Sequence, residues 1–399
     1  MTKLLDLKNN SVIAINQNNY TKEDNYKKVC YLDTDNITNN RINAFLKIDL
    51  TKEKLPSRAK RKCSLNSIIY SSVRPNQRHF GIIKEIPKNF LVSTAFIVID
   101  IIDLKKLDPN YLYYYITQDK ITHYLQRIAE CGTSSYPSIT PLDFLNIKIK
   151  LYPLETQQKI ARTLSILDQK IENNHKINEL LHKILELLYE QYFVCFDFLD
   201  ENNKPYQTSG GKMKFSKELN RLIPSGWSVR FLNHKIVSTY QPKTISKTLL
   251  NDSYSYSVYG GGGIIGRFTE YNHEQSEFII SCRGQCGISY LTLPKSWITG
   301  NAMVIRPTKS YTSKTYLYHT IKKYKLTNYI TGSVQPQITR QNLSTMPILI
   351  PKRKTLNKWN NISSLLWNLI HNNMQSTQTL TALRDFLLPL LLKQQVKPE

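Results

Sequence analysis

The longest pattern of apolar and polar positions lies near the middle of the chain, between Leu154 and Phe193. Steps of four and three residues alternate along one row of positions, which is the spacing of a coiled-coil seam. Neither proline nor glycine interrupts the stretch, so the pattern predicts a single helix roughly 60 Å long. The row consists of Ile160, Leu164, Leu167, Ile171, Asn174, Asn178, Leu181, Leu185, Leu188 and Tyr192.

A second row with the same spacing lies near the C-terminus. Both rows carry asparagine at mid-length (Asn174 and Asn178, then Asn373), and a buried asparagine in a seam fixes helix register. One row alone is as typical of a core helix as of a coiled coil, but two rows predict an intramolecular antiparallel pair. The second row consists of Ile362, Leu366, Leu369, Asn373, Ser376, Leu380, Leu383, Leu387 and Leu390.

Outside the two rows, short apolar runs alternate with turn residues, which predicts a mixture of strands and shorter helices. We expect a helix from Tyr111 to about Ala129, because Asp108 is a good N-cap and Pro109 suits a first helical turn. Strands are expected near residues 28–32, 67–70, 81–83, 91–102 and 144–152. Between the rows we expect a glycine-rich turn within 258–272, a hairpin at 278–291, strands at 300–307 and 346–351, and a helix at 315–323.

The order of the elements repeats along the chain. GTSSYPSIT corresponds to GSVQPQIT, with Pro137 and Ile139 matching Pro336 and Ile338. NYLYYYI likewise corresponds to TYLYHTI, and STAFIVI to GNAMVIR. Each copy is a globular unit of about 150 residues followed by a long helix. We therefore expect an α+β protein with two pseudo-repeated globular units separated by two long antiparallel coiled-coil helices. Its four segments are residues 1–153, 154–198, 199–351 and 352–399.

Composition points to a polyanionic partner. The chain has 399 residues, of which 41% are hydrophobic, enough for substantial cores. Its 54 basic and 30 acidic residues give a net charge of +24, and the excess is spread along the chain rather than gathered in a tail. Such a charge favours nucleic acid over a membrane surface. A genome rich in A and T is the alternative explanation for the many lysine, asparagine and isoleucine residues.

The cysteines and the chain start favour a cytoplasmic protein. Of six cysteines only Cys282 and Cys286 are close in sequence, and no second pair completes a zinc site. Reduced thiols are therefore expected. The start MTKLLDLKNN lacks the long apolar run of a signal peptide. No stretch of about 18 apolar residues is present, so no membrane span is expected.

The candidate DNA-binding residues lie in predicted loops. In the first unit, basic loops alternate with apolar strands, and strands give such loops a rigid base. A solvated basic face is the alternative. The first unit offers Arg58, Lys60, Arg61, Lys62, Arg74, Arg78 and Tyr136. The second unit offers Tyr259, Arg267, Arg283, Gln285, Gln335 and Gln337.

Different side chains among these candidates suit different parts of DNA. Arginine and glutamine make bidentate contacts to guanine and adenine edges, whereas lysine more often contacts phosphates. Two units in one chain can each read one part, or half-site, of a DNA sequence. Arg283→Ala is therefore expected to relax sequence choice at one half-site, and Lys62→Ala to weaken binding equally on all sequences.

Motifs of catalysis are not evident in the sequence. The nearest match to the [ND]-P-P-[YF] motif of amino-methyltransferases is DPNY, which fits a helix cap better. The run Gly260 to Gly263 is not followed by Gly-Lys-Ser/Thr, so it is not a phosphate loop. The eight histidines are scattered, and no P-D…[DE]-x-K nuclease pattern occurs. These observations favour a binding module over an enzyme.

Two sets of motifs follow one another along the chain. The first unit carries PSRAKRK, IIYSSVRPN and YPSIT, and then YPLETQQKIARTLSILDQKI. The second set is EQYFVCFDF, SGGKM, IPSGW, YGGGGIIG, GNAMVIRP and LRDFLLPLLL. In these motifs, which together cover nearly the whole chain, the protein resembles the specificity subunit of Type I restriction–modification systems.

The resemblance implies two target-recognition domains, each reading one half of a bipartite site in double-stranded DNA. It also implies two long helices that pair antiparallel, act as a spacer, and dock two copies of a methyltransferase subunit. A restriction subunit with translocase and nuclease activity joins that core. The recognition subunit has no catalytic residues and no cofactor, because S-adenosylmethionine, ATP and magnesium belong to the partners.

Two readings from other classes stay open on the residues alone. One is a self-contained DNA methyltransferase or nuclease with diverged motifs. The other is a coiled-coil adaptor without a nucleic-acid role.

Overall fold

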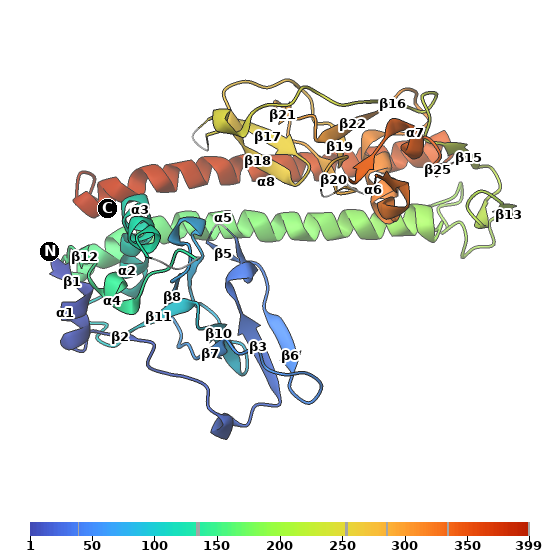
Figure 1. Cartoon of the computed structure of the whole chain (residues 1–399). Helices are drawn as coiled ribbons and strands as arrows, with labels where there is room; N and C mark the ends of the chain where they lie inside the picture. Colours follow the sequence, from blue (N-terminus) through green and yellow to red (C-terminus); the bar gives the residue numbers. More distant parts are fainter. Residues whose placement is uncertain (39, 133–135, 252–253, 285, 333–334, 398–399) are drawn as a thin grey trace. The chain divides into compact units, whose positions relative to one another are not determined.

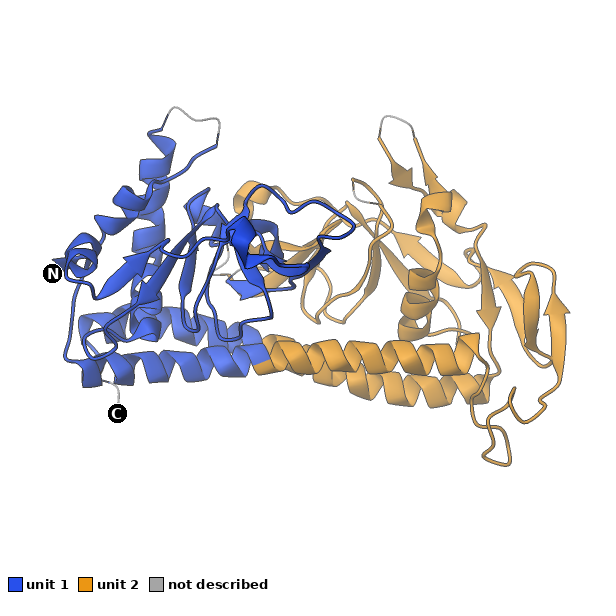
Figure 2. Ribbon diagram, turned by 90° about the horizontal axis from the view of Figure 1, so that it is seen from below, with its two compact units in different colours: residues 1–172, 377–399 blue, residues 173–376 orange. Residues whose placement is uncertain are grey.

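The computed structural model of the chain describes residues 1–38, 40–132, 136–251, 254–284, 286–332 and 335–397. They form two compact units, coloured separately in Figure 2. Unit 1 comprises residues 1–172 and 377–399, and unit 2 comprises residues 173–376. Each long helix therefore contributes one part to each unit.

Unit 1 is built on an antiparallel sheet in the order β2 (Ile13–Ile15), β11 (Phe96–Ile101), β8 (Ile68–Ser71) and β9 (Phe80–Ile82). The first three of these strands are labelled in Figure 1. A second sheet has the order β6 (Leu46–Asp49), β3 (Lys28–Leu32), β10 (Phe90–Ser93) and β7 (Ala59–Arg61). Short strands β1 (Thr2–Lys3) and β12 (Lys148–Ile149) pair with each other, as do β4 (Ile37–Thr38) and β5 (Arg41–Ile42). The shorter helices are α1 (Leu4–Asn9), α2 (Pro109–Ile116), α3 (Asp119–Glu130) and α4 (Pro141–Leu145).

Unit 2 contains a sheet with the same order, namely β16 (Val237–Tyr240), β22 (Ala302–Pro307), β19 (Phe278–Ser281) and β20 (Ser289–Leu291). Its second sheet has the order β18 (Gly263–Phe268), β17 (Tyr256–Gly260) and β21 (Trp297–Ile298). The paired short strands are β13 (Met213–Ser216) with β14 (Arg221–Pro224), β15 (Ser228–Phe231) with β25 (Pro347–Ile350), and β23 (Ile330–Thr331) with β24 (Gln337–Ile338). The shorter helices are α6 (Lys314–Lys323) and α7 (Arg340–Leu343).

The main sheets of the two units and several elements around them correspond, which confirms the repeat read from the sequence, whereas the second sheets differ in their number of strands. Strands β2, β11, β8 and β9 of unit 1 match β16, β22, β19 and β20 of unit 2. The pair β1–β12 matches β15–β25, and both are antiparallel. Helices α4 and α7 also match, because Thr140 and Thr339 cap them in the same way.

The two predicted long helices are α5 (Leu154–Tyr189), which continues as a π-helical turn to Val194, and α8 (Arg353–Lys393). Within unit 1 the Tyr152 hydroxyl donates to the Leu392 carbonyl at 2.9 Å. Within unit 2 the Asn373 amide donates to Asn178 Oδ1 at 2.9 Å. Along the chain, a residue just before α5 thus meets the end of α8, and a residue further along α5 meets an earlier part of α8, so the antiparallel pair is confirmed. The contact between Asn178 and Asn373 was not predicted from the sequence.

The seam on α5 is confirmed, but the seam predicted on α8 is displaced in unit 2. None of the ten predicted positions on α5 is exposed. On α8, Ile362 and Leu369 of unit 2 are exposed, as is Leu383 of unit 1, and the buried row in unit 2 is Trp359, Ser363, Trp367 and Ile370. The reason is that α8 packs on the globular core as well as on α5, and the two tryptophans draw the buried face around the helix.

Three local predictions in unit 1 were wrong. The run at 91–102 is two strands, β10 and β11, because Thr94 and Ala95 form a turn. The helix expected from Tyr111 to about Ala129 divides into α2 and α3, although Asp108 caps it as predicted, accepting from the Tyr111 N–H at 2.9 Å. The strand expected at 144–152 is reduced to β12, because Thr140 and Pro141 start helix α4.

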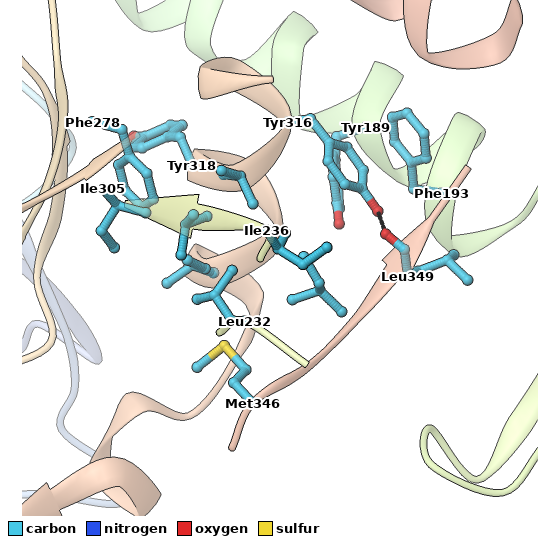
Figure 3. Packing of buried hydrophobic residues seen from close by; sticks show 14 of the residues in the cluster. Tyr189, Phe193, Leu232, Ile236, Phe278, Ile305, Tyr316, Tyr318, Met346 and Leu349 are labelled. Atoms are coloured by element: carbon cyan, nitrogen blue, oxygen red, sulfur yellow. Dashed lines mark hydrogen bonds between the residues drawn. The ribbon is translucent and has the colours of Figure 1, made fainter. Parts of the chain in front are cut away.

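Each long helix supplies part of a globular core. In unit 2, Tyr189 and Phe193 at the end of α5 share one cluster with Phe278 and Ile305 of the main sheet. Figure 3 shows this cluster, including the Tyr316 hydroxyl, which donates to the Leu349 carbonyl at 2.6 Å. In unit 1 the start of α5 and the end of α8 share a cluster with β8, β11 and α2. Neither unit is complete without both helices.

His319 of α6 lies inside the unit 2 core. Its ring is 3% exposed, stacks on Tyr189 at 5.6 Å between centroids, and meets the edge of Trp359 at 5.3 Å. Among the described residues its Nε2 has no hydrogen-bond partner. Burial, aided by nearby Lys322, lowers the pKa of His319 from 6.5 to about 3. The histidine is therefore held neutral.

We expect this histidine to make unit 2 sensitive to acid. The pKa of His319 is near 6.5 in the unfolded chain but about 3 in the folded chain. The contribution of this residue to the free energy of unfolding is therefore full above pH 6.5 and is lost as the pH falls. Between pH 8 and pH 5 the loss is about 2 kcal/mol. His319→Phe keeps an aromatic ring at this position but cannot be protonated. The free energy of unfolding should therefore fall less between pH 8 and pH 5 in this variant, as measured by denaturant titration at both pH values. Replacing the exposed His234 by Gln is the control, and an unchanged pH dependence in His319→Phe would contradict the assignment.

Candidate nucleic-acid interface

In unit 1 the loop after β8 is joined to the loop before α4. Val73 and Ser138 form a single antiparallel β-bridge. The Arg74 N–H donates to the Pro137 carbonyl at 2.9 Å, and the Ile139 N–H donates to the Ser72 carbonyl at 2.8 Å. Two segments more than 60 residues apart in sequence are thereby held as one surface element.

Buried residues fix this element to the unit. Ile139 is 4% exposed and belongs to the main core, and the next residue, Thr140, caps α4. On the other segment, Pro75 is buried and Arg74 has a left-handed backbone with φ of 47°. A non-glycine residue in that region is held there only by the surrounding structure. The loop is thus a defined support for the side chains it exposes.

Arg74 and Tyr136, both predicted as DNA contacts, come together on this element. Both side chains are exposed, and the Arg74 guanidinium lies over the Tyr136 ring at 5.4 Å from its centroid. A ring face attracts a cation and orients the planar guanidinium. The pair presents a charged, flat group to solvent, which suits a base edge or a phosphate.

Unit 2 joins the corresponding loops in the same way. Arg283 and Gln337 form a single antiparallel β-bridge, and the Ile338 N–H donates to the Cys282 carbonyl at 3.0 Å. The Cys286 thiol donates to the Pro336 carbonyl at 3.1 Å. Ile338 is 2% exposed and anchors the loop as Ile139 does in unit 1.

The predicted residues of this loop pair face solvent. Arg283, Gln335 and Gln337 are all exposed. The structure therefore brings three of the predicted residues of unit 2 to one place. Gln285 lies outside the described residues.

The basic cluster of unit 1 divides into exposed and engaged residues. Arg58 and Lys60 are exposed on and beside β7. Arg61 is half-buried, and burial lowers its pKa. The Lys62 ammonium donates to Asp24 at 2.6 Å, a contact that raises the pKa of Lys62. Arg58 and Lys60 are therefore the better candidates for phosphate contacts.

Arg78 is engaged in a different contact. It lies half-exposed and forms an ion pair with Asp119 at the start of α3, at 2.9 Å. This pair connects the end of the β8 loop to α3. Any contact of Arg78 with a phosphate would compete with Asp119.

Two predicted residues of unit 2 are occupied within the fold. Tyr259 is 3% exposed, and its hydroxyl accepts from the Leu293 N–H at 3.0 Å, so the expectation of a surface contact was wrong. The residue packs in a buried cluster with Ile279, Ile298 and Val304. Arg267 is half-buried on β18, and its guanidinium donates to the carbonyls of Tyr254 and Ser255. Arg267 thus holds the loop at Tyr254 and Ser255 in place. The prediction that Arg267 contacts DNA is corrected, because its guanidinium already donates to these carbonyls.

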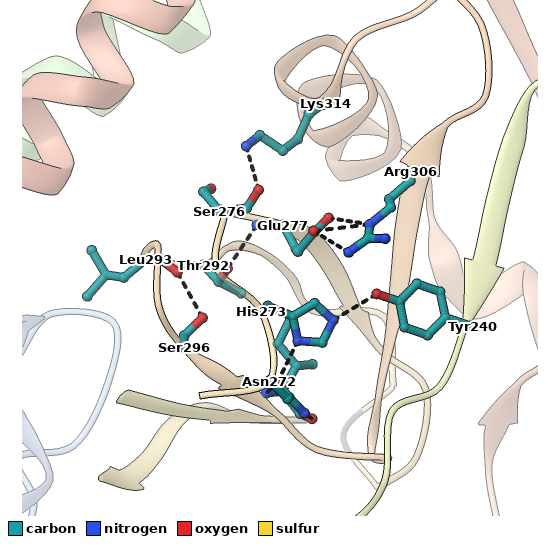
Figure 4. Close-up of polar contacts among 11 residues, drawn as sticks. Tyr240, Asn272, His273, Ser276, Glu277, Thr292, Leu293, Ser296, Arg306 and Lys314 are labelled. Carbon is teal, nitrogen blue, oxygen red and sulfur yellow. Dashed lines mark hydrogen bonds and ion pairs between the residues drawn. The ribbon is translucent and has the colours of Figure 1, made fainter. Parts of the chain in front are cut away.

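A polar network centred on the buried His273 and Glu277 supports the strand that leads to Arg283 (Figure 4). The Tyr240 hydroxyl donates to His273 Nε2 at 2.7 Å, and His273 Nδ1 donates to Asn272 Oδ1 at 2.5 Å. Glu277 accepts two hydrogen bonds from Arg306 Nε and one from Arg306 Nη2, at 2.6 to 3.0 Å. The segment preceding β19 is thereby fixed to β16 and β22.

The network resembles a catalytic relay in its residue types but not in its geometry. His273 is 6% exposed, and both of its ring nitrogens are engaged. A general base needs a free nitrogen that a substrate can reach. We therefore assign the network to bracing the sheet.

The described part of the chain shows no group of histidine, cysteine and carboxylate side chains that could hold a metal ion. All six cysteines are unpaired thiols. No described helix has the length and apolar content needed to cross a membrane.

Sequence reasoning missed two residues at this interface. Val73 and Ser138 occupy in unit 1 the bridge positions that Arg283 and Gln337 occupy in unit 2. Ser138 could have been found from the sequence, because the match of Pro137 with Pro336 aligns it with the predicted residue Gln337. Val73 had no such signal, since its loop differs in length from the one after β19.

The fold and the two joined loop pairs define a modular DNA-binding protein with two related recognition units. A sequence profile described as the Type I restriction modification DNA specificity domain matches residues 6–183 and 224–383. The chain belongs to this family. Specificity subunits recognise DNA sequence and are not the catalytic subunits of their systems, so DNA recognition is the role of this chain. Its partners are DNA and the other subunits of such a system.

Individual relatives agree with the family assignment. The chain is 23% identical to the HindI specificity subunit of Haemophilus influenzae, in an alignment that covers 93% of this chain and 95% of that one. It is 24% identical to the MjaIX specificity subunit of Methanocaldococcus jannaschii, covering 73% of this chain and 69% of that one. The crystal structure of a Type I S subunit from M. genitalium shares the fold, with a TM-score of 0.56, 16% identity, and coverage of 98% and 99%.

The exposed Lys60 is expected to contribute affinity without sequence preference. Lys60→Ala removes one cation, so the slope of log K against log salt concentration falls by about 1, equally for specific and unrelated DNA. Fluorescence anisotropy across a salt series measures both slopes. Lys62→Ala is the control, because Asp24 already neutralises that ammonium and the slope should change less. A larger effect from Lys62→Ala than from Lys60→Ala would contradict this division of roles.

Proposed function

We propose that the chain reads an asymmetric, two-part DNA sequence, one part through each unit. The observation that supports this most directly is the shared sheet order of the two units, combined with different side chains on their joined loops. A homodimer presents two identical surfaces and reads identical half-sites. A tandem repeat in one chain presents two different surfaces, so its half-sites can differ.

The long helices have the second role, which is assembly. They dock two copies of a methyltransferase subunit, and a restriction subunit with translocase activity joins that core. S-adenosylmethionine, ATP and magnesium act on those partners, and this chain holds no cofactor. The complex works on cytoplasmic DNA.

An apolar row on α5 in unit 2 supports the docking role. Ile177, Leu180, Ile184 and Leu187 are 44 to 61% exposed and follow the three–four–three spacing of one helix face. Single exposed apolar residues are ordinary, but a continuous row marks an interaction surface. On α8 of the same unit, exposed apolar residues recur at Ile362, Leu365 and Leu369.

Charges placed on this row are expected to weaken docking. Leu180→Glu combined with Leu187→Glu should reduce affinity for the methyltransferase subunit more than tenfold, because burying each leucine contributes about 1.5–3 kcal/mol. DNA binding by the chain alone should not change. Titration calorimetry measures the first quantity and anisotropy the second. Lys183→Gln, an exposed neighbour outside the row, is the control, and unchanged affinity in the double variant would refute the docking surface.

The proposed function is tested by mapping modified bases in genomic DNA from cells with and without this gene. We expect a motif of two different short parts separated by a fixed gap, present only with the gene. A motif that persists without the gene, or a single uninterrupted one, would overturn the proposal. Purified chain assayed alone with S-adenosylmethionine or Mg²⁺ should show no methylation or cleavage, because those activities belong to the partner subunits. Activity of the chain alone would instead indicate a self-contained enzyme.

The length of the helix pair is expected to set the gap. One heptad inserted in α5 and one at the paired position in α8 lengthen the pair by roughly 10 Å, which corresponds to about three base pairs. The recognised gap should grow while both half-sites keep their sequence. Base-modification mapping with the longer chain reads out all three features. An unchanged gap with intact half-sites would show that the helices do not set the spacing.

A further inference from the structure

The same β-bridge occurs in both units but carries different side chains. In unit 1 it joins Val73 to Ser138, and in unit 2 it joins Arg283 to Gln337. Both bridges connect the loop after the third strand in the sheet order to the loop before the capped short helix. The backbone is therefore shared, and the side chains are what distinguish the units at this point.

The bridge places two side chains next to each other on one face. Residues directly opposite in an antiparallel pair have Cβ atoms about 4.5–5.5 Å apart and point to the same side. The residue after each bridge, Ile139 or Ile338, points inward and is buried. Successive side chains on a strand alternate in direction, so the bridge residues point outward. Ser138, Arg283 and Gln337 are exposed, and Val73 is half-buried.

The position of this pair is defined by its supports. The Cys282 carbonyl is held by the Ile338 N–H, and Gln337 also pairs with Thr331 of β23. The network of Tyr240, His273 and Asn272 braces the sheet behind it. A side chain that reads a base must start from such a fixed backbone, because a misplaced donor loses its bidentate geometry.

We propose that this bridge pair is the specificity-determining pair of each unit, an inference that rests on the proposed function. In unit 2, Arg283 recognises guanine through O6 and N7, and Gln337 recognises adenine through N6 and N7. The side chains start about 5 Å apart, close to the 3.4 Å rise between base pairs, so they address neighbouring bases. The second half-site therefore contains a guanine adjacent to an adenine position.

The bridge of unit 1 offers a different chemistry. The Val73 side chain suits the methyl group of thymine, and the Ser138 hydroxyl donates or accepts with more than one base. Arg74, which follows Val73 in the chain, adds a charged group beside this pair. Two units on one backbone plan thus acquire different targets through two positions each.

Substitutions that change the hydrogen-bonding pattern test the inference. Gln337→Glu replaces an amide by a carboxylate, which accepts from cytosine N4, so the adenine preference should become a cytosine preference. Arg283→Lys keeps the charge but loses the bidentate fork, so discrimination for guanine should fall roughly 5- to 150-fold. The full-length chain is used to select duplexes from a library randomised in both half-sites, and bound sequences are counted. The first half-site and the gap should not change.

Gln341→Glu makes the same chemical change on an exposed residue of α7, off the bridge, and should leave the adenine preference intact. If both bridge variants keep the original second half-site while still binding DNA, the inference is overturned. If the unaltered chain selects no two-part motif, the proposed function itself fails, so the two failures are distinguishable. Loss of all binding in one variant, with the other keeping guanine or adenine, also counts against the bridge pair.

Discussion

Each unit depends on the burial of one face of α5 and α8 against a globular sheet as well as against each other. In unit 1, Ile160 and Leu164 of α5 lie in one cluster with Leu391 and Leu392 of α8 and with the strands. In unit 2, Leu185 and Tyr189 share a cluster with Trp359. A helix of this length is not stabilised by its own hydrogen bonds alone, and tertiary packing supplies the rest. The helices are therefore core elements as much as connectors.

This arrangement separates the framework from the recognition surface. The loops that carry Arg74 and Arg283 are joined to their partners by backbone hydrogen bonds, which any residue can accept and any residue except proline can donate. Buried Ile139 and Ile338 anchor the loops from behind. The exposed side chains can change without disturbing either support. A new DNA preference therefore costs the unit little stability, since surface substitutions away from caps and cores have small effects.

Burial also explains why the candidate site was only partly predictable. Arginine and glutamine at loop positions signalled DNA contact, and for Arg74, Arg283 and Gln337 the structure places them on the joined loops. The same residue types elsewhere are used within the fold: Arg267 bonds backbone carbonyls, Arg78 pairs with Asp119, and Tyr259 faces the core. Residue type gives the chemistry of a group, but which of its neighbours uses that chemistry depends on contacts distant in sequence.

The sequence by itself determined the two long helices, their antiparallel pairing and the internal repeat. These features follow from periodicity and from matched motifs, and both can be read from the chain without knowledge of its tertiary contacts. Only the tertiary structure decided which face of α8 is buried, because Trp359 and Trp367 meet the core of unit 2 and displace the row from Ile362 and Leu369. It also decided that Val73 faces Ser138 as Arg283 faces Gln337. Such pairs form between segments far apart in the chain, and strand register, which brings them together, is set by packing rather than by sequence spacing.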